Sequence, residues 1–537
     1  MTKCEIYFLE MAVESLWFEI TNKFLIKVAP LLAILKRRIH HRGLNKLSIS
    51  LLYKTSMLTL INTNTMVPPI APIGLDYIAG AVRTAGFDAD VVDLCLSDNP
   101  DKTLKDYFAG HSPRLVGLSF RNTDDCFWPS AKWFVPDLVK RVKKIRTMTD
   151  SPIVIGGVGF SLFALRIVEY SGADFGVRGD GEQAMVSLYK ELRHLKHYEK
   201  VEGLIWHAGG KEHCNKPAWP DVLFLSTDRD AIDNKTYFEK GGQCGLETKR
   251  GCNHNCLYCA DPLAKGSALR LRNPVDVADE VQSLISQGVE VLHICDSEFN
   301  IPSRHAYDVC REFISRSLGD KIRWYTYMAV VPFDAELARL MEKAGCVGIN
   351  FTGDSACPSM LKTYNKTHSK DDLASAIRLC RQNGIKVMID LLLGGPGETA
   401  QTVSQTIDFI KQANPDCAGA PLGIRIYPGT PIAEMVMKEG VPEKNPNIRR
   451  KYSGQVDFFK PTFYIASGLG PYPAKLIKEM IAGDKRFFEP KEDIAPEDVS
   501  MTPTDHNYSD NIQLVEAIAK GERGAYWDIL KKIRDRK

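Results

Sequence analysis

The chain has 537 residues, enough for about three domains, and its 44% hydrophobic and 25% charged residues are ordinary for a soluble globular protein. The formal net charge is only +3, so composition gives no argument for binding nucleic acid or a membrane surface. The 14 cysteines are spread thinly, which argues against a small disulfide-stapled scaffold and favours a reduced, cytoplasmic setting.

Residues 1–56 differ in character from the rest of the chain. The apolar stretch 28–35, which precedes the basic run 36–42, is far too short to span a bilayer, and a signal-peptide pattern is missing. We expect no integral membrane span. The segment is either an amphipathic surface helix or, as we favour, an N-terminal extension that is poorly ordered or precedes a true start at Met57.

From residue 57 onward, short apolar runs alternate with helical patterns. Strands are expected at 58–62, 90–94, 115–120, 153–157 and 175–179, with helices at 74–85, 131–147 and 182–194. This alternation predicts a Rossmann-like, doubly wound parallel sheet over residues 57–200. Ligands of such sheets bind at the carboxyl ends of the strands, where glycines let the backbone approach closely. A nicotinamide site is disfavoured, because G-x-G-x-x-G does not follow the first strand.

The most informative stretch is the loop that carries Cys252, Cys256 and Cys259 at C-x3-C-x2-C spacing. Three thiolates on a tight loop can hold three irons of a [4Fe–4S] cluster and leave the fourth iron open. A structural zinc loop is the alternative, but such sites normally have four ligands, and no second cysteine or histidine pair lies nearby.

The residues after a connector at 201–243 form a second repeating pattern. Strands are expected at 245–250, 289–295, 322–328, 348–352, 386–393 and 422–427, separated by helices at 274–287, 304–316, 334–344, 370–383 and 398–412. Six such units predict a partial (β/α)6 TIM-type barrel over 244–430. The region 431–537 is expected to be small and mostly helical, and it either caps the barrel mouth or packs outside as a buttress. The predicted fold class is therefore α/β.

The cysteine spacing, with the aromatic Tyr258 before the third cysteine, resembles the radical S-adenosylmethionine (SAM) superfamily. The resemblance implies that Cys252, Cys256 and Cys259 hold a catalytic [4Fe–4S] cluster. In that family the open iron binds the amino and carboxylate groups of SAM, and an electron splits SAM into methionine and a 5′-deoxyadenosyl radical. An electron donor such as a flavodoxin or ferredoxin is implied as a partner.

The same resemblance implies SAM contacts at the strand ends. Asp296 and Glu298 would pair with the SAM ammonium in place of the family's Gly-Gly-Glu motif, and Asp354 would accept hydrogen bonds from the ribose. Arg425 would meet the SAM carboxylate or the substrate. The expected SAM set is Tyr258, Asp296, Glu298, Asp354, Gly394, Gly395, Arg425 and Ile426.

A Rossmann-like domain directly before this core resembles the cobalamin (B12)-dependent radical SAM enzymes. The resemblance rests on the phrases at 119–122, 156–160 and 178–182. Many B12 domains carry D-x-H-x-x-G after the first strand, but the corresponding loop has no histidine, so cobalamin would bind without that ligand. The expected cobalamin set is Asn62, Ser119, Arg121, Asn122, Gly156, Gly157, Gly159, Gly179 and Glu182.

Together these resemblances imply a cobalamin-dependent radical SAM enzyme, in the first place a C-methyltransferase. One SAM would generate the radical, and a second would remethylate the cobalt. The alternatives are a B12-dependent cyclase or ring-rearranging enzyme, a radical SAM enzyme without B12, and a non-catalytic B12-binding sensor. The substrate is expected to be a small molecule or a peptide rather than a nucleic acid.

Overall fold

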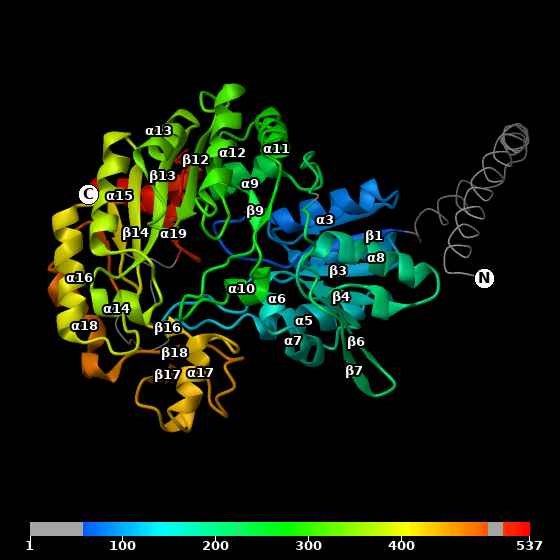
Figure 1. The fold of residues 1–537 in the computed structure, drawn as a ribbon. Helices are drawn as coiled ribbons and strands as arrows, with labels where there is room; N and C mark the ends of the chain where they lie inside the picture. The colour runs from blue at the N-terminus through cyan, green and yellow to red at the C-terminus, as the bar shows by residue number, and fades with distance from the viewer. Residues whose placement is uncertain (1–56, 224, 492–507, 537) are drawn as a thin grey trace, which may run out of the picture. The chain divides into compact units, whose positions relative to one another are not determined.

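The computed structural model describes residues 57–223, 225–491 and 508–536, so the expectation for residues 1–56 lies outside the described residues. From residue 57 the chain builds two largely parallel sheets, one after the other (Figure 1). Within the described ranges, no helix is long and apolar enough to cross a membrane.

The first sheet has the strand order β2-β1-β3-β4-β5-β6-β7. Its parallel strands are β1 (Leu58–Asn62), β2 (Ala89–Asp93), β3 (Leu115–Ser119), β4 (Ile153–Gly156) and β5 (Phe175–Val177). Two antiparallel strands extend it, β6 (Leu204–Ala208) and β7 (Lys211–Cys214), so part of the expected connector belongs to this sheet. The order reverses between β1 and β3, the switch point at which doubly wound sheets bind ligands.

Helices cover both faces of this sheet. Helices α3 (Ile73–Thr84) and α8 (Gly181–Arg193) pack together, as do α5 (Val135–Arg146) and α7 (Ala164–Ser171). Two separate apolar cores, one with α3 and α8 and one with α5 and α7, leave all five residues of β1 buried. The sequence patterns did not predict α4 (Pro100–Gly110) or α6 (Val158–Leu162).

The second sheet has seven parallel strands in the order β8-β11-β12-β13-β14-β15-β19. They are β8 (Cys244–Leu246), β11 (Val291–Ile294), β12 (Arg323–Met328), β13 (Cys346–Asp354), β14 (Lys386–Leu391), β15 (Cys417–Gly419) and β19 (Phe487–Phe488). The connecting helices are α11 (Pro274–Ser286), α12 (Ser303–Ser315), α13 (Ala335–Lys343), α15 (Lys370–Gln382) and α16 (Ala400–Ala413).

The end of this sheet differs from the prediction. The sixth strand is β15 rather than residues 422–427, because the left-handed Gly423 (φ 97°) lies between β15 and the next strand. The chain then forms β16 (Ile424–Arg425), which pairs in a separate small sheet with β18 (Thr462–Tyr464), itself paired with β17 (Ile448–Arg450). The seventh strand, β19, comes from the C-terminal region, which therefore completes the barrel sheet.

Each barrel strand alternates between two environments. On β12, Trp324, Thr326 and Met328 are fully buried, whereas Tyr327 is exposed. On β13, a side chain at Gly348 would strike Tyr325, and Asn350 bonds Asp390 of β14. Side chains alternate along a strand, so Trp324, Thr326 and Met328 face away from the barrel. The opposite, inner face of the sheet, which we call the barrel interior, carries Tyr325, Tyr327, Gly348, Asn350 and Asp390.

The C-terminal helices lie at the opposite end from the expected ligand site. The hydroxyl of Tyr325 and the ammonium of Lys386 both donate to Asp528 of α20 (Tyr526–Asp535), at 2.9 and 2.6 Å. Lys386 opens β14, so α20 closes the amino ends of the strands. Within the described part of the chain, α19 (Ile512–Ala519) and α20 therefore act as a buttress rather than as a cap on the mouth.

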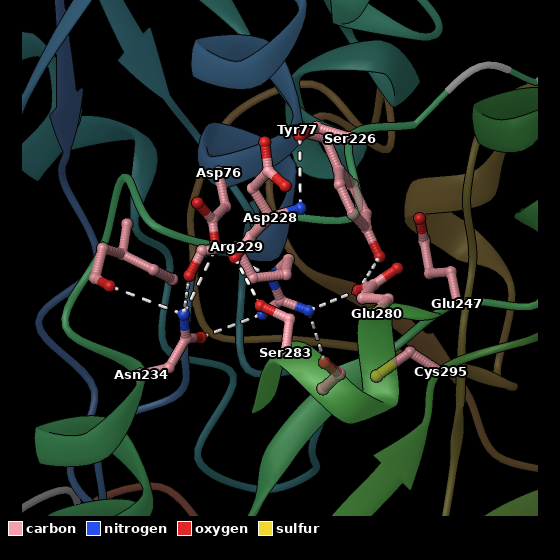
Figure 2. Close-up of polar contacts among 12 residues, drawn as sticks. Asp76, Tyr77, Ser226, Asp228, Arg229, Asn234, Glu247, Glu280, Ser283 and Cys295 are labelled. Atoms are coloured by element: carbon pink, nitrogen blue, oxygen red, sulfur yellow. Dashed lines mark hydrogen bonds and ion pairs between the residues drawn. The ribbon is translucent and has the colours of Figure 1, made fainter. Parts of the chain in front are cut away.

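A buried ion network joins the two sheets (Figure 2). Arg229, which is 1% exposed, donates to Asp76 of α3 at 2.7 Å and to Glu280 of α11 at 2.6 Å. The hydroxyl of Tyr77 also donates to Glu280, at 2.8 Å. Buried charges are tolerated only when they are paired, so this network strongly favours one placement of α3 against the barrel.

A second set of ion pairs lies close to the cysteine loop. Arg250 of β9 (Lys249–Arg250) donates to both carboxylate oxygens of Glu182, at 2.9 and 3.0 Å. Arg270 of β10 (Arg270–Leu271) pairs with Asp180. Asp180 and Glu182 belong to the loop and first turn that follow β5, so the strand leading into the cysteine loop is held against the first sheet.

Replacement of Arg229 by methionine should destabilise the protein strongly, because Asp76 would lose its charged partner among the described residues and Glu280 would keep only Arg272. Breaking a buried ion pair from one side costs about 3–5 kcal/mol. The matched control is Arg83→Met, whose partner Asp230 is exposed and whose surface ion pair should contribute about 0–1 kcal/mol. Urea denaturation of both variants checks this; equal midpoints for the two would contradict a structural role for the network.

Candidate functional site

The carboxyl ends of the first sheet's strands border a cavity of about 370 Å³ that the barrel domain also lines. From the first sheet come residues at the ends of β1, β3, β4 and β5, including Asn62, Ser119, Arg121, Asn122, Gly156, Gly157, Gly179 and Glu182. From the barrel domain come Gly245, Glu247, Arg250, Ala264, Lys265 and Cys295. The cavity thus gathers every residue of the expected cobalamin set except Gly159.

Glycines shape this cavity for a steric reason. Gly157 has φ 116° and Gly179 has φ 102°, and a Cβ at either position would strike the backbone of Phe120 or Ala218. Gly159 behaves differently from the expectation. Its missing Cβ makes room for the carbonyl of Arg121, which accepts a hydrogen bond from the Gly159 N–H at 2.8 Å, so Gly159 packs two loops together.

One cation in the cavity has no counter-ion. In the described residues, the guanidinium of Arg121 has no ion pair or hydrogen bond to a protein group, although it lines the cavity. Its positive charge lies close enough to lower the pKa of His293, Cys295 and Tyr327 of the barrel, although burial has the larger effect on each. No histidine is among the residues that line this cavity, consistent with the missing D-x-H-x-x-G motif. The glycine-lined cradle and the free guanidinium fit a large planar cofactor that takes no protein histidine.

The cysteine loop is compact and largely shielded from solvent. Cys252 and Cys256 are 8% and 9% exposed, and the N–H of Cys259 donates to the carbonyl of Cys256 at 3.2 Å. Burial raises the pKa of the Cys256 thiol to about 11, so this thiol holds its proton until a metal displaces it. Across the described ranges, no three Cys, His, Asp or Glu side chains converge on a single-ion site. A set of three thiolates suits an iron–sulfur cluster with one open iron, whereas structural zinc sites normally have four ligands.

Beside the cysteine loop, Tyr258, Asp354 and Lys366 form a polar group. Tyr258 donates to Asp354 at 2.6 Å, and the Lys366 ammonium lies 3.2 Å from the same carboxylate oxygen. Burial raises the pKa of Asp354, although Lys366 opposes the shift. Lys366 also lines a cavity of about 240 Å³ together with Thr352 and three residues of the cysteine loop, Asn253, His254 and Asn255.

Glu298 has unused capacity to bind a ligand. Its Oε1 accepts from the Thr352 hydroxyl at 2.9 Å, whereas Oε2 is buried without a partner among the described residues. Burial raises the pKa of Glu298 to about 7, with Lys366 as the main opposing charge. A carboxylate with a free oxygen beside the cysteine loop can bind a cation such as an ammonium group.

Asp296 contradicts the expectation that it contacts SAM. Both of its oxygens are occupied: the N–H and hydroxyl of Thr248 donate to them, and the Lys249 ammonium lies at 3.1 Å. The residue is buried and anchors the strand that leads into the cysteine loop. Acid residues at strand ends often serve such backbone anchoring, which sequence spacing alone does not distinguish from ligand binding.

Two other members of the SAM set are also engaged within the protein. Arg425 pairs with Asp124 at 3.0 Å and donates to the carbonyl of Phe458, so its charge is already neutralised. Ile426 is fully buried. Both side chains are therefore already engaged within the protein, and their expected contacts with SAM stay a prediction.

The N–H groups of Gly394 and Gly395 both donate to Glu398. A Cβ at Gly395 would collide with Tyr364, so this glycine is needed for packing. The two glycines therefore have a structural role whether or not SAM contacts their backbone.

The sequence reasoning missed the polar barrel interior and Lys366. His293, Tyr327, Asn350 and Asp390 lie inside strands that otherwise consist mainly of buried apolar residues. Polar residues at alternate positions of buried parallel strands are a usable signal, because such strands normally read as continuous apolar runs. Lys366 follows α14 (Pro358–Thr363) and has no local motif.

Two family models match the chain in the order of the two sheets. The B12 binding domain matches residues 60–189, and the radical SAM superfamily matches residues 246–410. The first model covers strands β1 to β5, and the second covers the cysteine loop and most of the barrel. The B12 match disfavours a radical SAM enzyme without a cobalamin domain.

Individual relatives agree over most of the chain. The tryptophan 2-C-methyltransferase of Streptomyces laurentii is 30% identical over 444 residues, which are 71% of this chain and 74% of the relative. A structure of the radical SAM methyltransferase TsrM from Kitasatospora setae, with tryptophan and a SAM analogue bound, has a TM-score of 0.82 at 29% identity. It covers 90% of this chain and 98% of that one.

A second TsrM structure, with cobalamin and a [4Fe–4S] cluster bound, has a TM-score of 0.80 at 28% identity and covers 90% of this chain and 99% of that one. This chain therefore shares both domains, their order and the fold with radical SAM methyltransferases. The chain belongs to the cobalamin-dependent radical SAM enzymes, and within that family it is a C-methyltransferase.

Proposed function

We propose that this methyltransferase acts on a carbon of a small aromatic amino acid of the tryptophan type. The similarity to a tryptophan 2-C-methyltransferase extends across both cofactor domains, and this observation carries the proposal. The TsrM structure that this chain matches over 98% of the TsrM length has tryptophan bound. A barrel interior with aromatic and hydrogen-bonding side chains suits such a substrate.

The protein's part in the chemistry is to hold and orient its cofactors. When bound, the [4Fe–4S] cluster supplies the electron that cleaves SAM, and cobalamin supplies the carrier for the methyl group. We assign the cluster to Cys252, Cys256 and Cys259. For cobalamin we assign the loops after β1, β3, β4 and β5, where Arg121 would put a fixed positive charge against the corrin in place of a histidine.

For SAM we assign Glu298 to the ammonium group and the Asp354–Tyr258 pair to the ribose. Glu298 offers a buried oxygen that no described residue uses. Lys366 keeps Asp354 oriented and adds a positive charge for the SAM carboxylate. The burial of these groups strengthens each interaction, because water does not compete for them.

The reaction needs a reducing partner. We propose a flavodoxin or ferredoxin as the electron donor and the cytoplasm as the compartment. All 13 cysteines that the structure describes are free thiols, which agrees with a reducing environment.

Replacement of Cys256 by alanine should remove the iron–sulfur absorption and abolish SAM cleavage, because three thiolates are the minimum that holds this cluster. The control is Cys214→Ala, which removes an exposed thiol on β7 and should leave both properties intact. Iron content and methionine release, measured after anaerobic reconstitution, check the pair. A full cluster in the Cys256→Ala variant would refute the ligand assignment.

The affinity for SAM should rise as the pH increases from 5.5 to 7. Glu298 has a pKa raised to about 7, so it is mostly protonated at pH 5.5 and half ionised at pH 7, while the ammonium of SAM keeps its charge in this range. The dissociation constant should fall about tenfold, because the ionised fraction grows by about that factor.

In the Glu298→Gln variant this pH gradient should disappear. Equilibrium dialysis of the cluster-loaded enzyme at several pH values checks it. A gradient that persists in Glu298→Gln would mean that another group, such as Asp354, binds the ammonium.

The proposed function is tested directly with the full chain. Anaerobic reconstitution with iron, sulfide and hydroxocobalamin should load about four irons and one cobalamin per chain. With deuterated-methyl SAM, a reductant and tryptophan, mass spectrometry should detect a labelled methyl group on tryptophan, and NMR should place it on carbon. Omission of hydroxocobalamin should abolish the product. A loaded enzyme that cleaves SAM but leaves tryptophan unchanged would reject this substrate.

A further inference from the structure

One aromatic side chain of the barrel interior is accessible at the middle of the sheet. Tyr327 lies on β12, one of the inner strands, yet it is 37% exposed, whereas Thr326 and Met328 beside it on the other face are fully buried. The ring of His293 lies beside the Tyr327 ring, with centroids 5.1 Å apart. Part of the Tyr327 ring therefore stays accessible on the barrel interior, beside the ring of His293.

Asn350 lies beside Tyr327 on the neighbouring strand and has an unused hydrogen-bond acceptor. It pairs with Tyr327 in the strand register and is 3% exposed. Its amide nitrogen donates to Asp390 at 3.3 Å. That oxygen, Oδ1, has no hydrogen-bond donor among the described residues. A buried acceptor without a partner costs about 1–3 kcal/mol, so such an atom in a native fold calls for an explanation.

The position of Asn350 along β13 places it next to the proposed SAM site. Two residues further on, Thr352 contacts Glu298 of the proposed SAM site. Two residues earlier, Gly348 lies against Tyr325 and Trp527, which close the amino end of the barrel. The charge of Arg121, from the cobalamin cavity, reaches both His293 and Tyr327. A molecule held at Asn350 would thus lie next to the proposed SAM site and beside two barrel side chains that feel the charge of Arg121.

We propose that Asn350 Oδ1 is the substrate's hydrogen-bond acceptor in the barrel interior, where it accepts an N–H group while the substrate ring packs beside Tyr327 and His293. This inference rests on the proposed function and names the residue that selects the substrate. A site built to accept an N–H discriminates strongly against analogues that lack it, because the buried acceptor is then left unpaired. The donor is either the ring N–H or the ammonium group of a tryptophan-like substrate.

The first test compares tryptophan binding to wild type, Asn350→Leu and Met388→Leu, each loaded with cluster, cobalamin and SAM. Leucine keeps the approximate size of asparagine but removes the acceptor, so tryptophan affinity should fall about tenfold or more. Met388 pairs with Asn350 in the register and is fully buried, so Met388→Leu alters the same row without removing a polar atom and should change affinity less than threefold. SAM affinity and iron content should be unchanged in both variants.

The second test uses wild type alone and therefore does not depend on whether the variants fold. Benzothienylalanine lacks the ring N–H, and indole-3-propionate lacks the ammonium group. One of them should bind about tenfold more weakly than tryptophan, and the weaker one identifies the donor. In a folded Asn350→Leu variant this discrimination should disappear.

The outcomes separate the two proposals. Wild-type methylation of tryptophan together with unchanged tryptophan affinity in Asn350→Leu overturns the role of Asn350 and leaves the proposed function standing. Equal binding of tryptophan and both analogues by wild type likewise overturns only the role of Asn350. A wild-type enzyme that neither binds nor methylates tryptophan rejects the proposed substrate, and the assignment of Asn350 is rejected with it.

Discussion

The buried ion network around Arg229 is the interaction on which the remaining structure depends. One guanidinium neutralises Asp76 from the first sheet's helix α3 and Glu280 from the barrel's helix α11. Arg272 adds a second cation on Glu280 at 2.6 Å. Because uncompensated charge inside a protein is very costly, any relative shift of the two sheets that separates these groups is strongly disfavoured. The network therefore acts as a fixed joint between two domains that each hold a cofactor.

This joint determines where the reaction space lies. Doubly wound sheets and barrels both bind ligands at the carboxyl ends of their strands, and in this protein residues of both domains line one cavity. The Arg250–Glu182 pair ties the strand before Cys252 to the first turn of α8. A displacement of the cysteine loop would consequently be coupled to the loop at the end of β5. Enzymes that pass a group between two cofactors need this kind of rigid placement, because small errors in distance and orientation reduce rates greatly.

The acidic residues near the site divide into anchors and ligand groups according to their partners. Asp296 and Asp124 are neutralised by Lys249 and Arg425, so they stabilise loops rather than bind a substrate. Glu298 retains a free oxygen and a pKa raised to about 7, which suits a group that meets a cation when the ligand arrives. Carboxylates at similar strand ends thus have different roles, because some have a cationic partner within about 3 Å and Glu298 keeps one oxygen without a hydrogen-bond partner.

Sequence patterns by themselves determined the features that depend on local chemistry. The spacing of Cys252, Cys256 and Cys259 indicated a three-thiolate cluster, since all its ligands lie within one short loop. Alternating strand and helix patterns indicated both parallel sheets, because periodicity reports which face of an element is buried. The glycines after β4 and β5 indicated a ligand cavity at the strand ends, and eight of the nine residues expected to bind cobalamin line that cavity.

Only the tertiary structure decided the features that depend on distant pairing. Arg425 and Asp124 are separated by 301 positions, so no local pattern shows that Arg425 is already neutralised. The same holds for Lys366 beside Asp354, for β19 as the seventh barrel strand, and for Asn350 with its unused oxygen. Periodicity places a side chain on a face, but which groups meet across that face, and which acceptor is left without a donor, is settled only when the whole chain packs.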